Sequence, residues 1–176
     1  MEFFTSDLHL DHEKILKYSP YRNDNFYSIQ QMNDWFIASI NDTVGRNDEL
    51  WILGDFCWGS GKVGHFRQRI QCRRVHFIYG NHDNKSAGRH FSTADTTSVI
   101  RRQNTRIHLS HFPLVEWSGM YHGSIHLYGH AHSTLEERLD AAFPGRRSID
   151  VGMDNAFRLL REWRPFSLKE LLRYFE

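Results

Sequence analysis

Five apolar runs in the sequence each end in side chains that can bind a metal ion or transfer a proton. The candidate metal ligands at these ends are Asp7, His9, Asp55, Asn81, His111, His130 and His132. They offer nitrogen and oxygen atoms without a thiolate, and they exceed what one ion takes from a protein while keeping a position open. The set therefore suits two first-row divalent ions that share a carboxylate. Mn²⁺ is the favoured metal, and Fe, Zn²⁺ and Ni²⁺ are the alternatives.

Taken alone, each cluster has an ordinary explanation. Asp-x-His is common, Gly-Asp is frequent in turns, and His-x-His occurs on surfaces. The prediction of a site comes from the joint occurrence of five clusters, each at the end of a predicted strand. In α/β sheets such ends meet in one crevice. Residues two apart on an extended chain point to the same side, so we expect Asp7 with His9, and His130 with His132, to aim together.

The first half of the sequence alternates strand-like and helix-like patterns. A helix is predicted over residues 28–43 and a shorter one around 63–70, because apolar side chains recur there at steps of three and four. With the strands between them, these helices predict parallel βαβ pairing. From about residue 97 the strand patterns follow one another without helices, up to a last strand over 148–152, which predicts antiparallel or mixed pairing.

The C-terminal part carries a capping box, Ser167-Leu168-Lys169-Glu170, which predicts a helix that runs to Tyr174. Residues 84–96 and 114–123 are polar and contain glycine, and we expect mobile loops there. No linker or low-complexity segment divides the sequence, so we expect a single domain over residues 1–176.

The composition is that of a globular protein without a strong charge. Hydrophobic residues make up 40% of the chain, and 22 Lys and Arg nearly balance 21 Asp and Glu. The net charge of +1 gives no general attraction to nucleic acid or to an anionic membrane. Two cysteines without a CxxC motif, and an N-terminus without the features of a signal peptide, predict a reduced, cytoplasmic protein. We expect no membrane partner, and the oligomeric state is left open.

The ordered series D-x-H, G-D, G-N-H-D, H and G-H-x-H resembles that of the calcineurin-like metallophosphoesterase superfamily. Its motifs run from Asp7 to His132, about three quarters of the chain. The opening DLHLDH and the closing RPFSLKELL also resemble the short, single-domain members of bacteria and phages. The resemblance implies an α/β fold, a four-layer α/β/β/α sandwich of two mixed sheets flanked by helices.

The resemblance also implies a role for each motif residue. One metal ion would be held by Asp7, His9 and His132, and the other by Asn81, His111 and His130, with Asp55 bridging both. His82 resembles the proton donor to the leaving-group oxygen, with Asp83 positioned to orient its imidazole. Asn81 would also help to stabilise charge on the phosphoryl oxygens, which makes it a candidate catalytic residue together with His82 and Asp83.

These roles predict a metal-dependent phosphoric ester hydrolase, in which a hydroxide that bridges the two metals attacks phosphorus in line. We expect a phosphodiesterase in preference to a phosphatase, because a proton donor such as His82 helps a poor leaving group. The expected substrate is small and phosphorylated, and nucleotide-like chemistry is included. His12 is a candidate substrate-binding residue, and a surface histidine at a helix start explains it equally well. Phe56, Trp58 and Trp117 are candidates for stacking on a base or an aromatic leaving group, and ordinary packing at the rim of the core explains them as well.

Two other function classes remain as alternatives. The first is a non-catalytic protein-binding scaffold with the same fold, which the complete ligand set and His82 argue against. The second is a sequence-independent nuclease, which would need a basic groove that the near-zero net charge does not favour.

Overall fold

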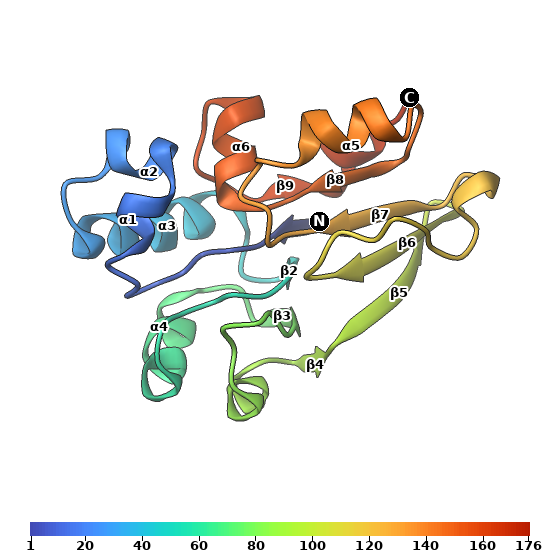
Figure 1. Cartoon of the computed structure of the whole chain (residues 1–176). Helices are drawn as coiled ribbons and strands as arrows, with labels where there is room; N and C mark the ends of the chain where they lie inside the picture. The colour runs from blue at the N-terminus through green and yellow to red at the C-terminus, as the bar shows by residue number, and fades with distance from the viewer.

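The computed structural model describes residues 1–176 apart from the side chain of Ser60, and the described chain forms two sheets that pack face to face (Figure 1). The first sheet has the strand order β4-β3-β2-β1-β9. Its first four strands are parallel, and β9 is antiparallel to β1. The strands are β1 (Glu2–Thr5), β2 (Glu49–Ile52), β3 (Arg74–Ile78), β4 (Thr93–Asp95) and β9 (Phe166–Ser167).

The second sheet has the order β5-β6-β7-β8 and is also mixed. Strand β5 is antiparallel to β6, whereas β6, β7 and β8 run parallel. The strands are β5 (Thr97–Arg102), β6 (Thr105–Ser110), β7 (Ile125–Tyr128) and β8 (Ser148–Asp150). Both predictions, parallel pairing in the first half and mixed pairing in the second, are confirmed.

Alternation along the strands divides the apolar side chains between two cores. In β1, Phe3 packs in the core that α3 (Ile29–Thr43) and α4 (Val63–Arg69) cover, whereas Phe4 points to the opposite face of the sheet. There it joins a core that includes Leu127 of β7. The first core therefore lies between helices and the first sheet, and the second lies between the sheets.

The remaining helices follow the site-bearing strands or close the far side of the molecule. They are α1 (Ile15–Tyr18), α2 (Pro20–Asn25), α5 (Glu136–Ala142), α6 (Met153–Leu160) and α7 (Leu168–Tyr174). Glu136 of α5 contacts Tyr128 of β7 on the outer face of the second sheet. Helices thus flank both sheets, and the predicted four-layer α/β/β/α sandwich is confirmed.

Two of the helices predicted from local patterns, α3 and α7, begin at a serine whose side chain caps the helix. Ser28 caps α3 by accepting a hydrogen bond from the Gln31 amide at 3.2 Å. The capping box of α7 is present, with Ser167 and Glu170 each accepting from the other's backbone amide. Among the described residues, no helix is long and apolar enough to cross a membrane.

Of the two expected loops, residues 84–96 are largely structured, whereas residues 114–123 are mostly irregular. Residues 84–96 contain a 3₁₀ helix, η2 (Lys85–His90), and the edge strand β4, so that stretch is largely structured. Residues 114–123 contain a further 3₁₀ turn, η3 (Met120–His122), and η1 (Ser60–Lys62) precedes α4. The second half is also not free of helices, because α5 connects β7 to β8 and so allows these strands to run parallel.

Candidate metal centre

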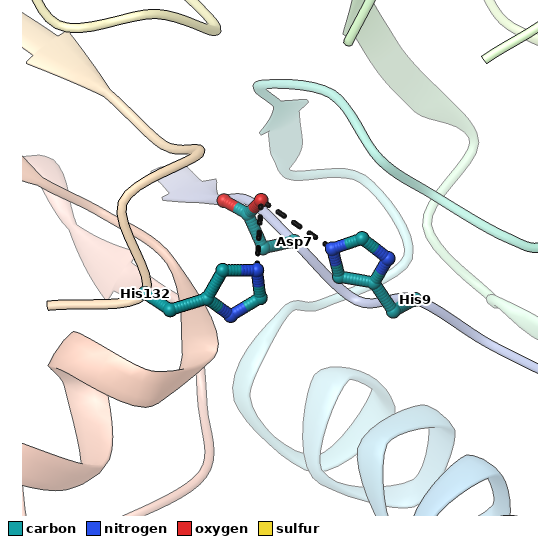
Figure 2. A group of neighbouring side chains, drawn as sticks. All are labelled: Asp7, His9 and His132. Atoms are coloured by element: carbon teal, nitrogen blue, oxygen red, sulfur yellow. Dashed lines mark ion pairs between the residues drawn. The ribbon is translucent and has the colours of Figure 1, made fainter. Parts of the chain in front are cut away.

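All seven predicted ligands lie together, because the ends of five strands meet at one edge of the two sheets. The ligands that follow β1, β2 and β3 belong to the first sheet, and the ligands that follow β6 and β7 belong to the second. Asp7 lies at the centre of one group. Nε2 of His9 and Nε2 of His132 each lie 3.7 Å from the same oxygen, Asp7 Oδ1. Figure 2 shows both imidazoles directing a ring nitrogen at this oxygen.

Asp55 lies between this group and a second one. Its Oδ2 is 3.5 Å from His9 Nε2 and 3.4 Å from His111 Nε2, so one carboxylate oxygen faces an imidazole from each group. In the second group, the Asn81 side-chain oxygen is 3.0 Å from both His111 Nε2 and His130 Nδ1.

The residues present fit metal ions. Asp7 Oδ1 and His9 Nε2 are buried without a hydrogen-bond partner in the described chain, and both point into the first group. Burying unpaired polar atoms is costly, and a cation coordinated there would remove that cost. Ligand atoms of Asp7, His9 and His132, and of Asp7, Asp55 and His111, lie within 4.8 Å of one another. Nitrogen and oxygen donors are those that first-row divalent ions accept.

The backbone at the centre is strained. Five of the seven predicted ligands have left-handed φ values, namely Asp7 (55°), His9 (47°), Asp55 (53°), His130 (69°) and His132 (46°). Residues with a side chain rarely adopt this conformation, and each costs of order 1–3 kcal/mol. Such strain concentrates at functional sites, where the surrounding structure enforces it. It is enforced here by backbone hydrogen bonds such as Asp7 N–H to the Gly54 carbonyl (3.0 Å).

Two glycines allow the strand ends to approach closely. A Cβ atom on Gly80 would lie 2.2 Å from Asp55 Oδ1, and one on Gly129 would lie 2.4 Å from Asp7 Oδ2. The glycine that opens the Gly80-Asn81-His82-Asp83 motif is therefore needed to bring β3 against the end of β2.

Asp83 does not lie where the resemblance implied. Its carboxylate accepts hydrogen bonds from the backbone amides of Asp55 (2.6 Å), Phe56 (3.1 Å) and Gly80 (2.8 Å). Within the described chain it makes no hydrogen bond to the His82 imidazole, so the expectation that it orients that ring is wrong. Asp83 instead joins the ends of β2 and β3, and burial raises the pKa of its carboxyl group.

Hydrogen bonds fix the orientation of two predicted ligands. Nδ1 of His111 lies 2.8 Å from the Leu53 carbonyl and donates to it, which leaves Nε2 as the free donor atom for a metal. Nδ1 of His132 lies 2.8 Å from Asp154 Oδ2, which likewise leaves Nε2 facing Asp7. A carboxylate behind a ligating imidazole is a frequent feature of metal sites.

Asp154 and its partner Arg22 are residues that the sequence analysis missed. Both side chains are fully buried, and Arg22 pairs with Asp154 through Nη2 (2.6 Å) and Nε (3.1 Å). Arg22 also donates to the backbone carbonyls of Asp7 and Leu8. One buried ion pair thus supports His132 from behind and holds the loop that carries Asp7. No motif indicated this pair, because the partners are 132 positions apart.

Asp150 is a second missed carboxylate. It is fully buried at the end of β8 and accepts from the amides of Ser133 (2.9 Å) and Gly152 (2.7 Å). Burial and the nearby charge of Asp7 raise its pKa to about 7. Its two hydrogen bonds hold the loop after His132 and the turn after β8, and its carboxyl group lies close enough to Asp7 for the two to interact.

The charges of the centre are those of a cation site. Burial raises the pKa of Asp7, but the facing imidazole of His9 and the charges of His132 and His111 outweigh burial and hold the pKa below its usual range. Burial opposes the charged form of His111 too, and Asp55 and Asp7 nevertheless raise its pKa to about 9. The carboxylates thus stay ionised and favour positive charge beside them.

A cavity of about 970 Å³ opens onto the centre. Its lining includes His9, Asp55, His82, His130 and His132. The side chain of His82 is 38% exposed, and its Nε2 lies 4.0 Å from Asp55 Oδ2. This places a titratable group at the mouth of the centre rather than among the ligands.

Of the four other residues expected near the substrate, two line the cavity and two do not. His12 and Trp58 line the cavity, and burial lowers the pKa of His12 to about 4, so its ring is neutral at physiological pH. Phe56 is fully buried in the first core, and Trp117 is buried with its indole N–H donating to Ser124 Oγ at 3.0 Å. Neither Phe56 nor Trp117 is among the residues that line the cavity.

Comparison with known proteins agrees with this geometry. The family model described as "Calcineurin-like phosphoesterase" matches residues 3–166. The chain belongs to this family. The family implies divalent metal ions, and the calcineurin-like phosphoesterase fold here carries candidate ligand groups for them.

Relatives and solved structures extend over nearly the whole chain. The Gene 66 protein of Mycobacterium phage L5 is 28% identical over 90% of this chain and 88% of its own length. The uncharacterized protein MJ1445 of Methanocaldococcus jannaschii is 27% identical over 99% of this chain and 90% of its own. The crystal structure of the protein of unknown function AQ665 from Aquifex aeolicus is similar with a TM-score of 0.77 at 21% identity, covering 99% and 98% of the two chains. That similarity supports the fold.

Proposed function

We propose that this protein is a dinuclear metal-dependent phosphodiesterase. The observation that carries the proposal is the position of Asp55, one oxygen of which faces His9 of the first ligand group and His111 of the second. A single carboxylate between two sets of nitrogen and oxygen donors is the arrangement that two ions sharing a ligand require. Mn²⁺ is the proposed metal.

The ligands divide naturally into two groups around Asp55. The first would contain Asp7, His9 and His132, and the second Asn81, His111 and His130. When bound, the two ions supply Lewis-acid activation of water and neutralise charge on the phosphoryl oxygens. The strained backbone and the Arg22–Asp154 pair hold the donor atoms in place before any ion arrives.

His82 is proposed as the acid that donates a proton to the leaving-group oxygen. Its imidazole is at the mouth of the centre, 4.0 Å from Asp55 Oδ2, and it is exposed to the cavity where a substrate would lie. Its backbone amide donates to Asp55 Oδ1 at 3.0 Å, which fixes the loop relative to the ligand groups. A donor in this position matters most for a poor leaving group, and this favours a diester over a monoester.

The test is hydrolysis of bis(p-nitrophenyl) phosphate by metal-stripped protein as Mn²⁺ is added, with p-nitrophenyl phosphate as the monoester. Asp55→Asn should remove turnover and lower the bound metal below about two ions per chain. Asp42→Asn, which changes an exposed carboxylate of α3, is the matched control and should behave as wild type. A folded protein that binds no metal and cleaves neither compound would contradict the proposal and favour the scaffold alternative.

A further inference from the structure

Trp58 is an exposed indole that is nevertheless held rigidly. It is 46% exposed, although large aromatic side chains gain most from burial. Its backbone N–H donates to the Leu10 carbonyl at 2.8 Å, which ties the loop after β2 to the loop after β1. Its ring stacks on His12, with the centroids 4.2 Å apart and the planes inclined by 9°. The backbone hydrogen bond and the stacking on His12 therefore both hold Trp58 in its exposed position.

The open side of the indole belongs to the cavity. Trp58 lines the cavity, and His12 stacks on one face of its ring. His82 lies beside it, with ring centroids 5.2 Å apart. The same imidazole is 4.0 Å from Asp55, so His82 stands between the ligand groups and the indole.

We propose that Trp58 is the stacking platform for a nucleobase, and that the substrate is therefore a nucleotide phosphodiester whose leaving side lies over this indole. The inference rests on the proposed function, because it takes the scissile phosphate to sit at the ligand groups. The order of groups along the cavity, from ligands through His82 to Trp58, matches the order phosphate, sugar and base.

Other features of the cavity suit this substrate class. A volume of about 970 Å³ is larger than a phosphate alone requires and admits a nucleotide. Lys14 and Lys62 are also among its lining residues and can attract an anion, although Lys62 is paired with Asp11. Rigid presentation of the indole lowers the entropy lost when a base stacks on it.

The experiment compares two phosphate monoesters that differ in the base, adenosine 5′-monophosphate and ribose 5-phosphate, as analogues of the leaving side with its phosphate, by calorimetry on the Mn²⁺-loaded protein. Stacking of a base on an aromatic side chain contributes about 1–3 kcal/mol, so wild type should bind adenosine 5′-monophosphate about 5- to 150-fold more tightly. Trp58→Ala should remove this difference, and Trp58→Phe should keep part of it. Trp35→Ala removes an exposed indole that does not line the cavity and should leave the difference unchanged.

The outcomes separate this inference from the proposed function. If wild type hydrolyses bis(p-nitrophenyl) phosphate in a metal-dependent way but binds the two ligands equally, or binds adenosine 5′-monophosphate not at all, the role of Trp58 is overturned and the phosphodiesterase stands. If Trp58→Phe and Trp58→Ala both retain the full difference, the base lies elsewhere and the inference also fails. Absence of metal-dependent hydrolysis in wild type overturns the proposed function itself.

Discussion

Strand β7 and the loop that follows it supply side chains to two polar clusters of different kinds. His126 and Tyr128 belong to what we call the outer-face cluster, together with Glu136 of α5 and Arg146. The metal centre begins two residues beyond the strand, at His130. In the outer-face cluster a cation is already present, because Arg146 lies 3.3 Å from the Glu136 carboxylate and 3.2 Å from the Tyr128 hydroxyl.

Unpaired atoms alone do not distinguish the clusters, since His126 Nδ1 and Glu136 Oε2 lack partners as well. Charge balance does. In the described chain, no arginine or lysine pairs with the carboxylates of Asp7 and Asp55, which face imidazoles and backbone amides. Backbone strain also separates them, because left-handed residues gather at the metal centre and none of the four outer-face residues is among those described as left-handed. Buried histidines and carboxylates therefore indicate a metal site where no arginine or lysine pairs with the carboxylates and where the backbone adopts strained, left-handed conformations.

The largest expected effect is on catalysis at the mouth of the metal centre. His82→Ala should lower turnover of a diester with an alkoxide leaving group by about 10²–10⁴-fold, because the departing oxygen loses its proton donor. Loss should be smaller for a p-nitrophenyl diester, whose leaving group departs without a proton. His65→Ala, an exposed histidine of α4, should change neither rate. Equal losses on the two diesters would show that His82 acts in some other way.

Asp154→Asn should weaken both folding and metal binding. Removing one partner of the buried pair leaves Arg22 uncompensated and should lower the free energy of unfolding by about 3–5 kcal/mol. The weaker support of His132 should reduce Mn²⁺ affinity about 10- to 100-fold, as measured by competition with a chelator at a temperature where the variant is folded. Unchanged metal affinity in the folded variant would mean that Asp154 serves the fold alone.

Glu136→Gln is the matching change in the outer-face cluster and should affect folding only. It leaves Arg146 with a weaker, exposed partner in Asp140, so the free energy of unfolding should fall by about 3 kcal/mol. Chemical denaturation measures this loss. Mn²⁺ affinity and hydrolysis should stay at wild-type values, and a drop in metal affinity would show that the two clusters are coupled.

The smallest effect is a pH dependence of folding due to His126. Burial lowers the pKa of this fully buried histidine to about 3, whereas the unfolded chain binds the proton near the ordinary value. Its contribution to stability is therefore full above pH 6.5 and is lost as the pH falls toward 3, by about 1.5 kcal/mol between pH 6.5 and 5. Denaturation at these two pH values should show His126→Gln losing less stability than wild type. His122→Gln, at an exposed histidine of η3, should leave the dependence intact.

Much of the metal centre could be predicted because its signals are local in the sequence. Each ligand follows an apolar strand by one to a few residues, and parallel strands bring such positions to one edge. The apolar stripe that predicts α3 and the capping box that predicts α7 are also local.

The remainder depends on contacts that the sequence does not encode locally. Strand β9 pairs through two residues and β4 through three, which is too short for an alternating pattern to appear. Arg22 and Asp154 have no motif in common and meet only after α2 and α6 pack together. Asp83 lies beside His82 in the chain but faces backbone amides of another loop, so adjacency in sequence was a poor guide to its partner.

The ligands come from both sheets, with Asp7, Asp55 and Asn81 on one side and His111, His130 and His132 on the other. An ion held by these residues would act as a removable cross-link between the two halves of the sandwich. Separation of the sheets would then require release of the ion, and metal release would become part of the barrier to unfolding. The lifetime of the folded chain in a cell would then depend on the metal supply as well as on its own packing.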